Sequence, residues 1–184
     1  MTDIEGHIYY TVNLGNQEWM LRNLETSTFS NGDRIGTTRI NTQNIEQEEN
    51  PEYQWAFMDD ERYAEHLYDH GRLYTWYTVT DSRKICPEGW HLPTNDEWNE
   101  LITYLGDNAV TLRFKYIFLV QLVGYRDYTG QFQYGSNYGT YWWSATAGST
   151  GNGYAAYCRP SDIERLSLTE RDKKIGFSVR CVKD

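Results

Sequence analysis

The chain has 184 residues, a mass of 21.7 kDa and a formal net charge of −9, so its acidic surface disfavours a nucleic-acid phosphate backbone as a partner. Its length suits one domain with a sizeable core, and no apolar run approaches the roughly 20 residues of a membrane span, so no direct membrane insertion is expected. Sixteen tyrosines and seven tryptophans suit a binding surface as well as a core.

Residues 1–35 predict an N-terminal hairpin. Alternating side chains predict a strand over residues 7–13, Gly15-Asn16 supplies turn chemistry, and residues 17–21 are expected to return as the second arm. Residues 23–33 are polar and predict a turn-rich exit rather than a helix.

Residues 37–80 predict an irregular insert. Its first part, to Pro51, has almost no apolar residue and indicates a surface excursion. The rings of residues 53–77 follow no clean period, so we expect irregular structure fixed by buried aromatics, with a helical turn at 60–68. His66 and His70 could form a metal pair on one helix face or be solvated loop histidines. We favour the second interpretation because no third ligand is evident.

The stretch C-P-E-G-W-H-L-P-T-N-D-E-W-N-E-L begins at Cys86 and opens the core region, residues 84–184. Thr94 and Glu97 form the two halves of a capping box, which predicts that a helix begins after Thr94. Trp98, Leu101 and the following apolar residues make one stripe, and Gly106 is expected to end the helix.

A short second helix is expected at residues 109–114, followed by a strand over the apolar residues 116–123. Residues 125–160 are dominated by Tyr, Gly, Thr, Ser and Asn, a mixture typical of antibody paratopes. The alternative is a set of ordinary β-turns with half-buried tyrosines, and composition does not separate the two. Within this segment, strands are expected at 141–146 and 154–159, with a loop at 148–153.

The charged residues 161–174 predict a short strand and a turn at 171–174. Residues 175–182 alternate, which predicts a closing strand with Phe177, Val179 and Cys181 facing the core and Ser178 and Arg180 on a polar face.

The sequence offers no catalytic motif: dinucleotide-binding, P-loop, zincin and nucleophile-elbow patterns are all missing. The acidic pairs Asp59-Asp60 and Asp96-Glu97 read as turn and helix-start charges. The three cysteines, Cys86, Cys158 and Cys181, are too few for a zinc ribbon, and either one disulfide or three thiols are possible. We therefore expect no catalytic residue, no metal and no cofactor.

Six sequence blocks in order, from Asp3 to Asp184, resemble the Fibrobacter succinogenes major paralogous domain family. They include the opening D-I-E-G-H-I-Y-Y-T-V-N, G-R-L-Y-T-W-Y, the Cys86 stretch, G-Y-R-D-Y-T-G-Q-F, Y-W-W-S-A-T and G-F-S-V-R-C-V. The resemblance implies an α+β, C-type lectin-like fold over residues 1–184, with small mixed or antiparallel sheets, one or two helices and long irregular loops.

The same resemblance implies that the N-terminal hairpin and the C-terminal strand share a sheet, against which the helix at 95–105 packs. A second sheet containing residues 141–146 would present the Tyr- and Gly-rich loops. The resemblance also places Cys86 and Cys181 on neighbouring strands and implies a disulfide that constrains the unfolded chain by roughly 4–5 kcal/mol.

Functionally, the resemblance implies a non-catalytic module, displayed at the cell surface or outside the cell after export, that binds a protein or glycan. The chain shows no export signal at its start, so a phage particle or the cytoplasm stays open. The segment after Gly124 lies where a diversity-generating retroelement would act in some relatives. The residues expected to face a ligand are Tyr128, Tyr134, Tyr138, Tyr141, Thr150, Asn152, Tyr154, Tyr157, Arg159 and Arg165. Trp142, Trp143, Phe177 and Val179 are expected to belong to the scaffold.

Two alternative functions follow from similar folds. A calcium-dependent carbohydrate-binding lectin would carry E-P-N or Q-P-D with W-N-D, and these motifs are missing here. An oxidase similar to the formylglycine-generating enzyme would need a closely spaced cysteine pair, which Cys158 lacks.

Overall fold

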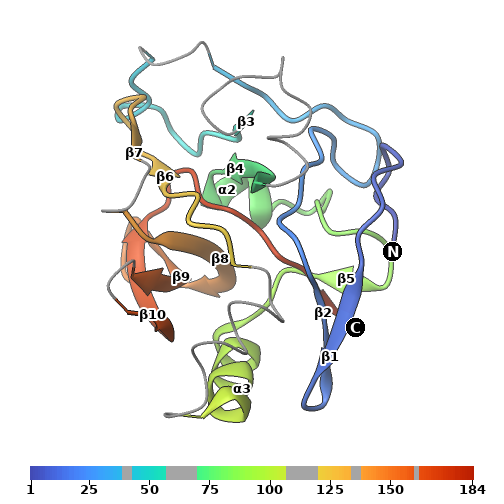
Figure 1. Ribbon diagram of the computed structural model, residues 1–184. Coiled ribbons are helices and arrows are strands. Elements are labelled where there is room, and N and C mark those ends of the chain that lie inside the picture. The colour runs from blue at the N-terminus through green and yellow to red at the C-terminus, as the bar shows by residue number, and fades with distance from the viewer. Residues whose placement is uncertain (39–42, 57–69, 107–119, 134–137, 160–161) are drawn as a thin grey trace.

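The computed structural model describes residues 1–38, 43–56, 70–106, 120–133, 138–159 and 162–184 (Figure 1). These ranges hold small antiparallel sheets and two helices, so the protein is of the mixed α+β class, as predicted. The elements are β1 (Thr11–Leu14), β2 (Gln17–Met20), β3 (Gln54–Ala56), β4 (Arg72–Tyr74), α2 (Trp76–Val79), β5 (Trp90–His91), α3 (Asn95–Leu105), β6 (Tyr125–Arg126), β7 (Phe132–Gln133), β8 (Thr140–Ala147), β9 (Asn152–Arg159), β10 (Asp162–Asp172) and β11 (Val182–Lys183).

The N-terminal hairpin and the last strand share a four-stranded sheet with the order β1-β2-β11-β5, as predicted. Val182 pairs with Trp19 on one side and with His91 on the other, which brings the two termini close together (Figure 1). The hairpin turns at Gly15, whose φ of +63° favours glycine. The strand predicted at 7–13 begins later, at Thr11, because Ile8 pairs back with Thr2 in a single bridge.

Helix α3 begins and ends where the sequence predicts. Both halves of the capping box form, since the Thr94 hydroxyl accepts from the Glu97 amide and the Glu97 carboxylate accepts from the Thr94 amide at 2.8 Å. Trp98 and Leu101 are buried, and the Trp98 ring lies 4.7 Å from the Trp19 ring of β2. The helix therefore packs against the four-stranded sheet, as predicted.

A second sheet has the order β10-β9-β8 and contains both strands predicted in the Tyr- and Gly-rich segment. The β8–β9 connection is shorter than predicted, because Asn152 and Gly153 already belong to β9. The short strand predicted after residue 161 is instead the 11-residue β10. It is long because residues 166–172 pair without interruption along β9, which the local charge pattern conceals.

The closing strand predicted at 175–182 is largely wrong. Only Val182–Lys183 forms a strand, whereas Phe177 and Ser178 make single bridges to Tyr74 and Trp142. The predicted polar face is also wrong, since Ser178 and Arg180 are 0% and 1% exposed. The segment runs through the interior between β8 and β4, visible in red in Figure 1, so side chains on both of its sides are covered.

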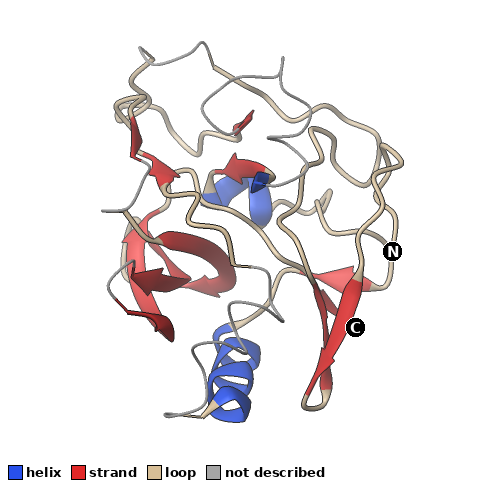
Figure 2. Cartoon of the chain, in the orientation of Figure 1, coloured by secondary structure: helices blue, strands red, loops and turns tan. Residues whose placement is uncertain are grey.

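Part of the insert is more regular than the sequence predicts. Strands β3 and β4 pair with each other, and α2 follows directly (Figure 2). The prediction of buried aromatics is confirmed at Trp55 and Tyr74, which are 1% and 0% exposed. The helical turn predicted at 60–68 lies outside the described residues, together with His66.

Two further predictions concern residues 107–123. The helix predicted at 109–114 and the first half of the strand predicted at 116–123 lie outside the described residues. Residues 120–123 are not in a strand. Pairing starts only at Gly124, which bridges Thr140, and continues in the short β6–β7 pair.

The predicted disulfide between Cys86 and Cys181 is confirmed, with a Cα–Cα distance of 5.9 Å. Neither cysteine lies within a strand, contrary to the prediction: Cys86 precedes β5 and Cys181 directly precedes β11. Cys158 stays a thiol in the core. None of the helices in the described ranges has the length and hydropathy that crossing a membrane requires.

Candidate functional site

The candidate site is one face of the β8-β9-β10 sheet. Tyr141 of β8 pairs with Tyr157 of β9, and Ser178 bridges Trp142 along the opposite edge of β8. Because side chains alternate across a strand, Tyr157, Tyr141 and Phe177 lie side by side on one face. We call these three rings, together with the neighbouring Tyr125 and Tyr138, the aromatic row.

The rings of the aromatic row are closely packed. Tyr141 is nearly parallel to Phe177, with centroids 4.7 Å apart, and to Tyr157, at 5.8 Å. Tyr125 meets Tyr141 edge-on at 5.6 Å, and Tyr138 meets Tyr125 edge-on at 6.2 Å. Phe177 is buried, whereas the four tyrosines are partly exposed, and Tyr138 is 37% exposed. The aromatic row therefore has a buried phenylalanine at its base and partly exposed tyrosines at its surface.

Arg171 of β10 lies on the same face, because it pairs with Gly153, two positions before Ala155 and four before Tyr157. Its guanidinium carbon is 5.6 Å from the centre of the Tyr141 ring, a distance typical of a cation–π contact. Nη1 donates to the Thr169 hydroxyl at 2.7 Å and to the Glu170 carbonyl at 2.8 Å. These bonds hold the cation beside the aromatic row.

A second cation lies on a ring near this face. The Lys173 amino group is 4.2 Å from the centre of the Trp76 ring. Trp76 fits there because Gly153 has no side chain: a Cβ at Gly153 would lie 2.4 Å from Trp76 Cδ1. The indole also donates to the Ser144 carbonyl at 3.0 Å, which fixes the ring against β8.

The environment of Tyr125 raises the pKa of its hydroxyl. Burial is the largest cause, and the neighbouring Tyr141, Asp127 and Tyr138 act in the same direction. The Tyr125 hydroxyl therefore stays protonated at neutral pH and can donate a hydrogen bond.

The structure brings together only some of the residues that the sequence predicts to face a ligand. Tyr138, Tyr141 and Tyr157 belong to the aromatic row. Tyr128 packs elsewhere, against a small cluster that contains Ile45 and Trp55. Tyr134 and the side chains of Arg159 and Arg165 lie outside what the structure describes.

Thr150, Asn152 and Tyr154 gather around the turn between β8 and β9. Tyr154 lies three residues before Tyr157 and so points to the opposite face of the sheet. The Tyr154 hydroxyl donates a hydrogen bond to the Glu170 carboxylate, and this bond raises the pKa of Tyr154. The pKa of Glu170 is lowered, mainly by hydrogen bonds from Ser149. These polar groups satisfy one another and are separate from the aromatic row.

Sequence reasoning missed Tyr125 and Arg171. A signal for Arg171 was present, because Ser167, Thr169 and Arg171 alternate with Leu166 and Leu168 and so continue a two-residue period through the predicted turn. No such signal exists for Tyr125, because it contacts Tyr141 only once the fold has brought β6 next to β8.

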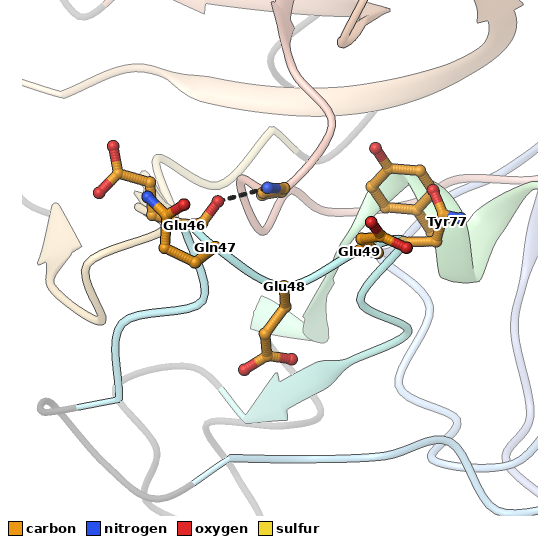
Figure 3. Close-up of a pocket in the computed structure, with 7 residues that line it drawn as sticks. Glu46, Gln47, Glu48, Glu49 and Tyr77 are labelled. Atoms are coloured by element: carbon orange, nitrogen blue, oxygen red, sulfur yellow. Dashed lines mark hydrogen bonds between the residues drawn. The ribbon is translucent and has the colours of Figure 1, made fainter.

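A shallow hollow of about 320 Å³ lies elsewhere, on the acidic part of the insert (Figure 3). The Lys174 amino group donates to the Glu46 carbonyl there, and Glu48 accepts a 2.7 Å hydrogen bond from the Tyr53 hydroxyl. Across the described ranges, no group of three metal-ligating side chains gathers. The Lys174 bond thus joins the insert to the segment after β10, whereas the Glu48 bond lies within the insert. The residues that line the hollow are Glu46, Gln47, Glu48, Glu49, Asn50, Tyr77 and Lys174.

Residues 12–117 match the family model of the Fibrobacter succinogenes major domain, which is more than half of the chain. The chain belongs to this family. No curated protein and no solved structure matches it. The part that matches the Fibrobacter succinogenes major domain runs from β1 past α3, and the aromatic row follows it along the chain.

Proposed function

We propose that this protein is a non-catalytic binding module that holds a protein or glycan ligand on the aromatic row and Arg171. The observation that carries the proposal is the row itself: four partly exposed tyrosines packed on a buried phenylalanine, with a cation beside them. Tyr and Arg dominate the energetic centres of protein interfaces, and tyrosines give contact area with few rotamers to freeze.

The proposal includes a C-type lectin-like fold. Three features support it: the hairpin and last strand share a sheet, α3 packs against that sheet, and a second sheet carries the aromatic row. In such an arrangement, the disulfide and the core clusters fix the scaffold, and the second sheet is left to present the ligand surface.

We also propose export to the cell surface or beyond. The Cys86–Cys181 disulfide supports an oxidising compartment, because disulfides persist mostly outside the cytosol. Diversification of the tyrosine-rich segment by a retroelement remains a prediction, supported by its position after the matched residues 12–117. A reverse-transcriptase gene with an imperfect repeat of this coding region nearby would test it.

The binding proposal is tested with two probes, a displayed library of random peptides and a printed glycan array. The double variant Tyr138→Ala/Tyr157→Ala should weaken binding of the selected peptide or glycan by about tenfold or more. Tyr154→Ala is the matched control, because it removes a tyrosine from the opposite face of the same strand. Equal losses in the two variants, or no loss in the double variant at an unchanged melting temperature, would contradict the site.

A further inference from the structure

We infer that the ligand is a polypeptide and that one of its acidic side chains binds Arg171 at the edge of the aromatic row. This inference rests on the proposed binding function and names the chemistry of its partner. Three features carry it: the charge environment of Arg171, the way its guanidinium is held, and the orientation of the rings.

The first feature is the charge environment of Arg171 and Lys173. The chain has a net charge of −9, and several of its cations pair with carboxylates, as in Arg22–Glu25 at 2.6 Å and Lys183–Glu18 at 2.7 Å. Arg171 and Lys173 contact aromatic rings, and no carboxylate of the described residues forms an ion pair with either. Two uncompensated cations on an acidic protein favour an anionic partner at this face.

The second feature is the fixed position of the Arg171 guanidinium. Only Nη1 is engaged, by the Thr169 hydroxyl and the Glu170 carbonyl, so Nε and Nη2 have no acceptor among the described residues. A guanidinium presents its donors as a planar fork that matches a carboxylate. Because Nη1 is already anchored, little side-chain entropy remains to be lost when a carboxylate binds.

The third feature separates a polypeptide from a sugar. Phe177 and Tyr157 lie on opposite sides of Tyr141, since they come from the two neighbours of β8, and both are nearly parallel to it. The Tyr141 ring therefore has an aromatic neighbour on each side and the Arg171 guanidinium carbon 5.6 Å from its centre, and Tyr125 and Tyr138 meet their neighbours edge-on. Stacking of a sugar ring would need an open aromatic face. Ring edges and hydroxyls around a cation suit the side chains and backbone of a polypeptide better.

The test is a selection of short random peptides, displayed on yeast, for binding to the full chain. We expect the selected peptides to share an Asp or Glu. Replacing that residue by Ala, or Arg171→Gln in the protein, should each weaken binding by about tenfold or more, and the two changes together should cost little more than either alone. Gln keeps an amide that can donate to Thr169, which protects the fold. Lys183→Gln, a matched loss of one positive charge on the other sheet, should leave binding unchanged.

The outcomes separate this inference from the proposed function. The acidic contact with Arg171 would be wrong if the selected peptides share no acidic residue. It would also be wrong if their binding is insensitive to Arg171→Gln but sensitive to Tyr138→Ala/Tyr157→Ala, and in both cases the proposed binding surface would be retained. Binding to a glycan array with no peptide selected would show that the ligand is not a polypeptide. If neither probe binds, or if bound probes ignore both sets of variants, the proposed function fails as well.

Discussion

Oδ1 of Asn23 accepts hydrogen bonds from Nε of Arg180 at 3.0 Å and from the indole nitrogen of Trp142 at 2.8 Å, inside the core. Its amide group donates to the His70 carbonyl at 2.8 Å and to the Ser178 hydroxyl at 3.3 Å. One side chain from the first loop thus connects the insert, β8 and the segment that leads to β11.

Replacing Asn23 by Leu should therefore be strongly destabilising. Buried donors on Arg180 and Trp142 would lose this acceptor, and such losses cost about 1–3 kcal/mol each. Urea denaturation should show the loss as a lower midpoint. Asn23→Asp keeps the acceptor oxygens and should lose less stability. A Leu variant that unfolds at the wild-type urea concentration would show that this network contributes little.

The disulfide should dominate the stability of the isolated protein. It closes a loop of 95 residues, so its loss should lower the free energy of unfolding by roughly 4–5 kcal/mol on the chain-entropy account. Cys86→Ser/Cys181→Ser, and the wild type in reducing agent, should both melt at a much lower temperature. Cys158→Ala is the control and should still respond to the reductant. A wild-type melting temperature that reductant does not change would contradict the prediction.

His91 should make stability depend on pH. Its ring nitrogens lie 2.6 Å from Glu97 Oε1 and 2.7 Å from Asp184 Oδ1. Burial lowers the pKa of His91, but the hydrogen bonds to Asp184 and Glu97 outweigh it, so the pKa is raised above 6.5. The contribution of protonated His91 to the free energy of unfolding is therefore fully present below pH 6.5. It is lost as the pH rises through the folded-state pKa of His91.

Because these pairs are partly exposed, the effect should stay below about 1 kcal/mol. Chemical denaturation between about pH 5 and pH 9 covers both sides of the ordinary histidine pKa. The free energy of unfolding should fall as the pH rises above 6.5. His91→Gln keeps hydrogen-bonding groups without a titrating charge, so its stability should lack this fall. An identical pH profile in both proteins would rule out His91 as the cause.

A side chain at position 153 should lower the stability of the protein. A Cβ there would press on Trp76 Cδ1 at 2.4 Å, and overpacking of this kind costs about 1–3 kcal/mol. Gly153→Ala should lower the melting temperature, and adding Trp76→Leu should restore part of the loss by making room. If the Ala variant is as stable as the wild type, Trp76 moves more freely than its hydrogen bond to the Ser144 carbonyl suggests.

Local signals in the sequence predicted local structure well. The capping box at Thr94 and Glu97 predicted the start of α3, because both partners lie within one helical turn. The hairpin around Gly15 likewise depends on neighbouring residues. The disulfide came from a family resemblance instead, since spacing alone does not pair three cysteines.

The predictions that were wrong concern residues whose environment is set by distant parts of the chain. Ser178 and Arg180 look solvent-facing by alternation, yet Asn23, 155 and 157 residues away in sequence, covers and binds them. The candidate site shows the same limit. Composition identified Tyr138, Tyr141 and Tyr157, but only the register of β8 and β9 separates Tyr157 from Tyr154, and only long-range pairing adds Tyr125.

The position of β11 also affects when the protein can fold. Val182 lies between β2 and β5 inside the four-stranded sheet, so this sheet has no continuous hydrogen bonding until almost the last residue of these 184 has been synthesised. The hairpin therefore lacks this partner strand until a much later part of the chain has been synthesised. Folding should therefore be completed after, rather than during, translation of this segment, and the disulfide to Cys181 should form late for the same reason.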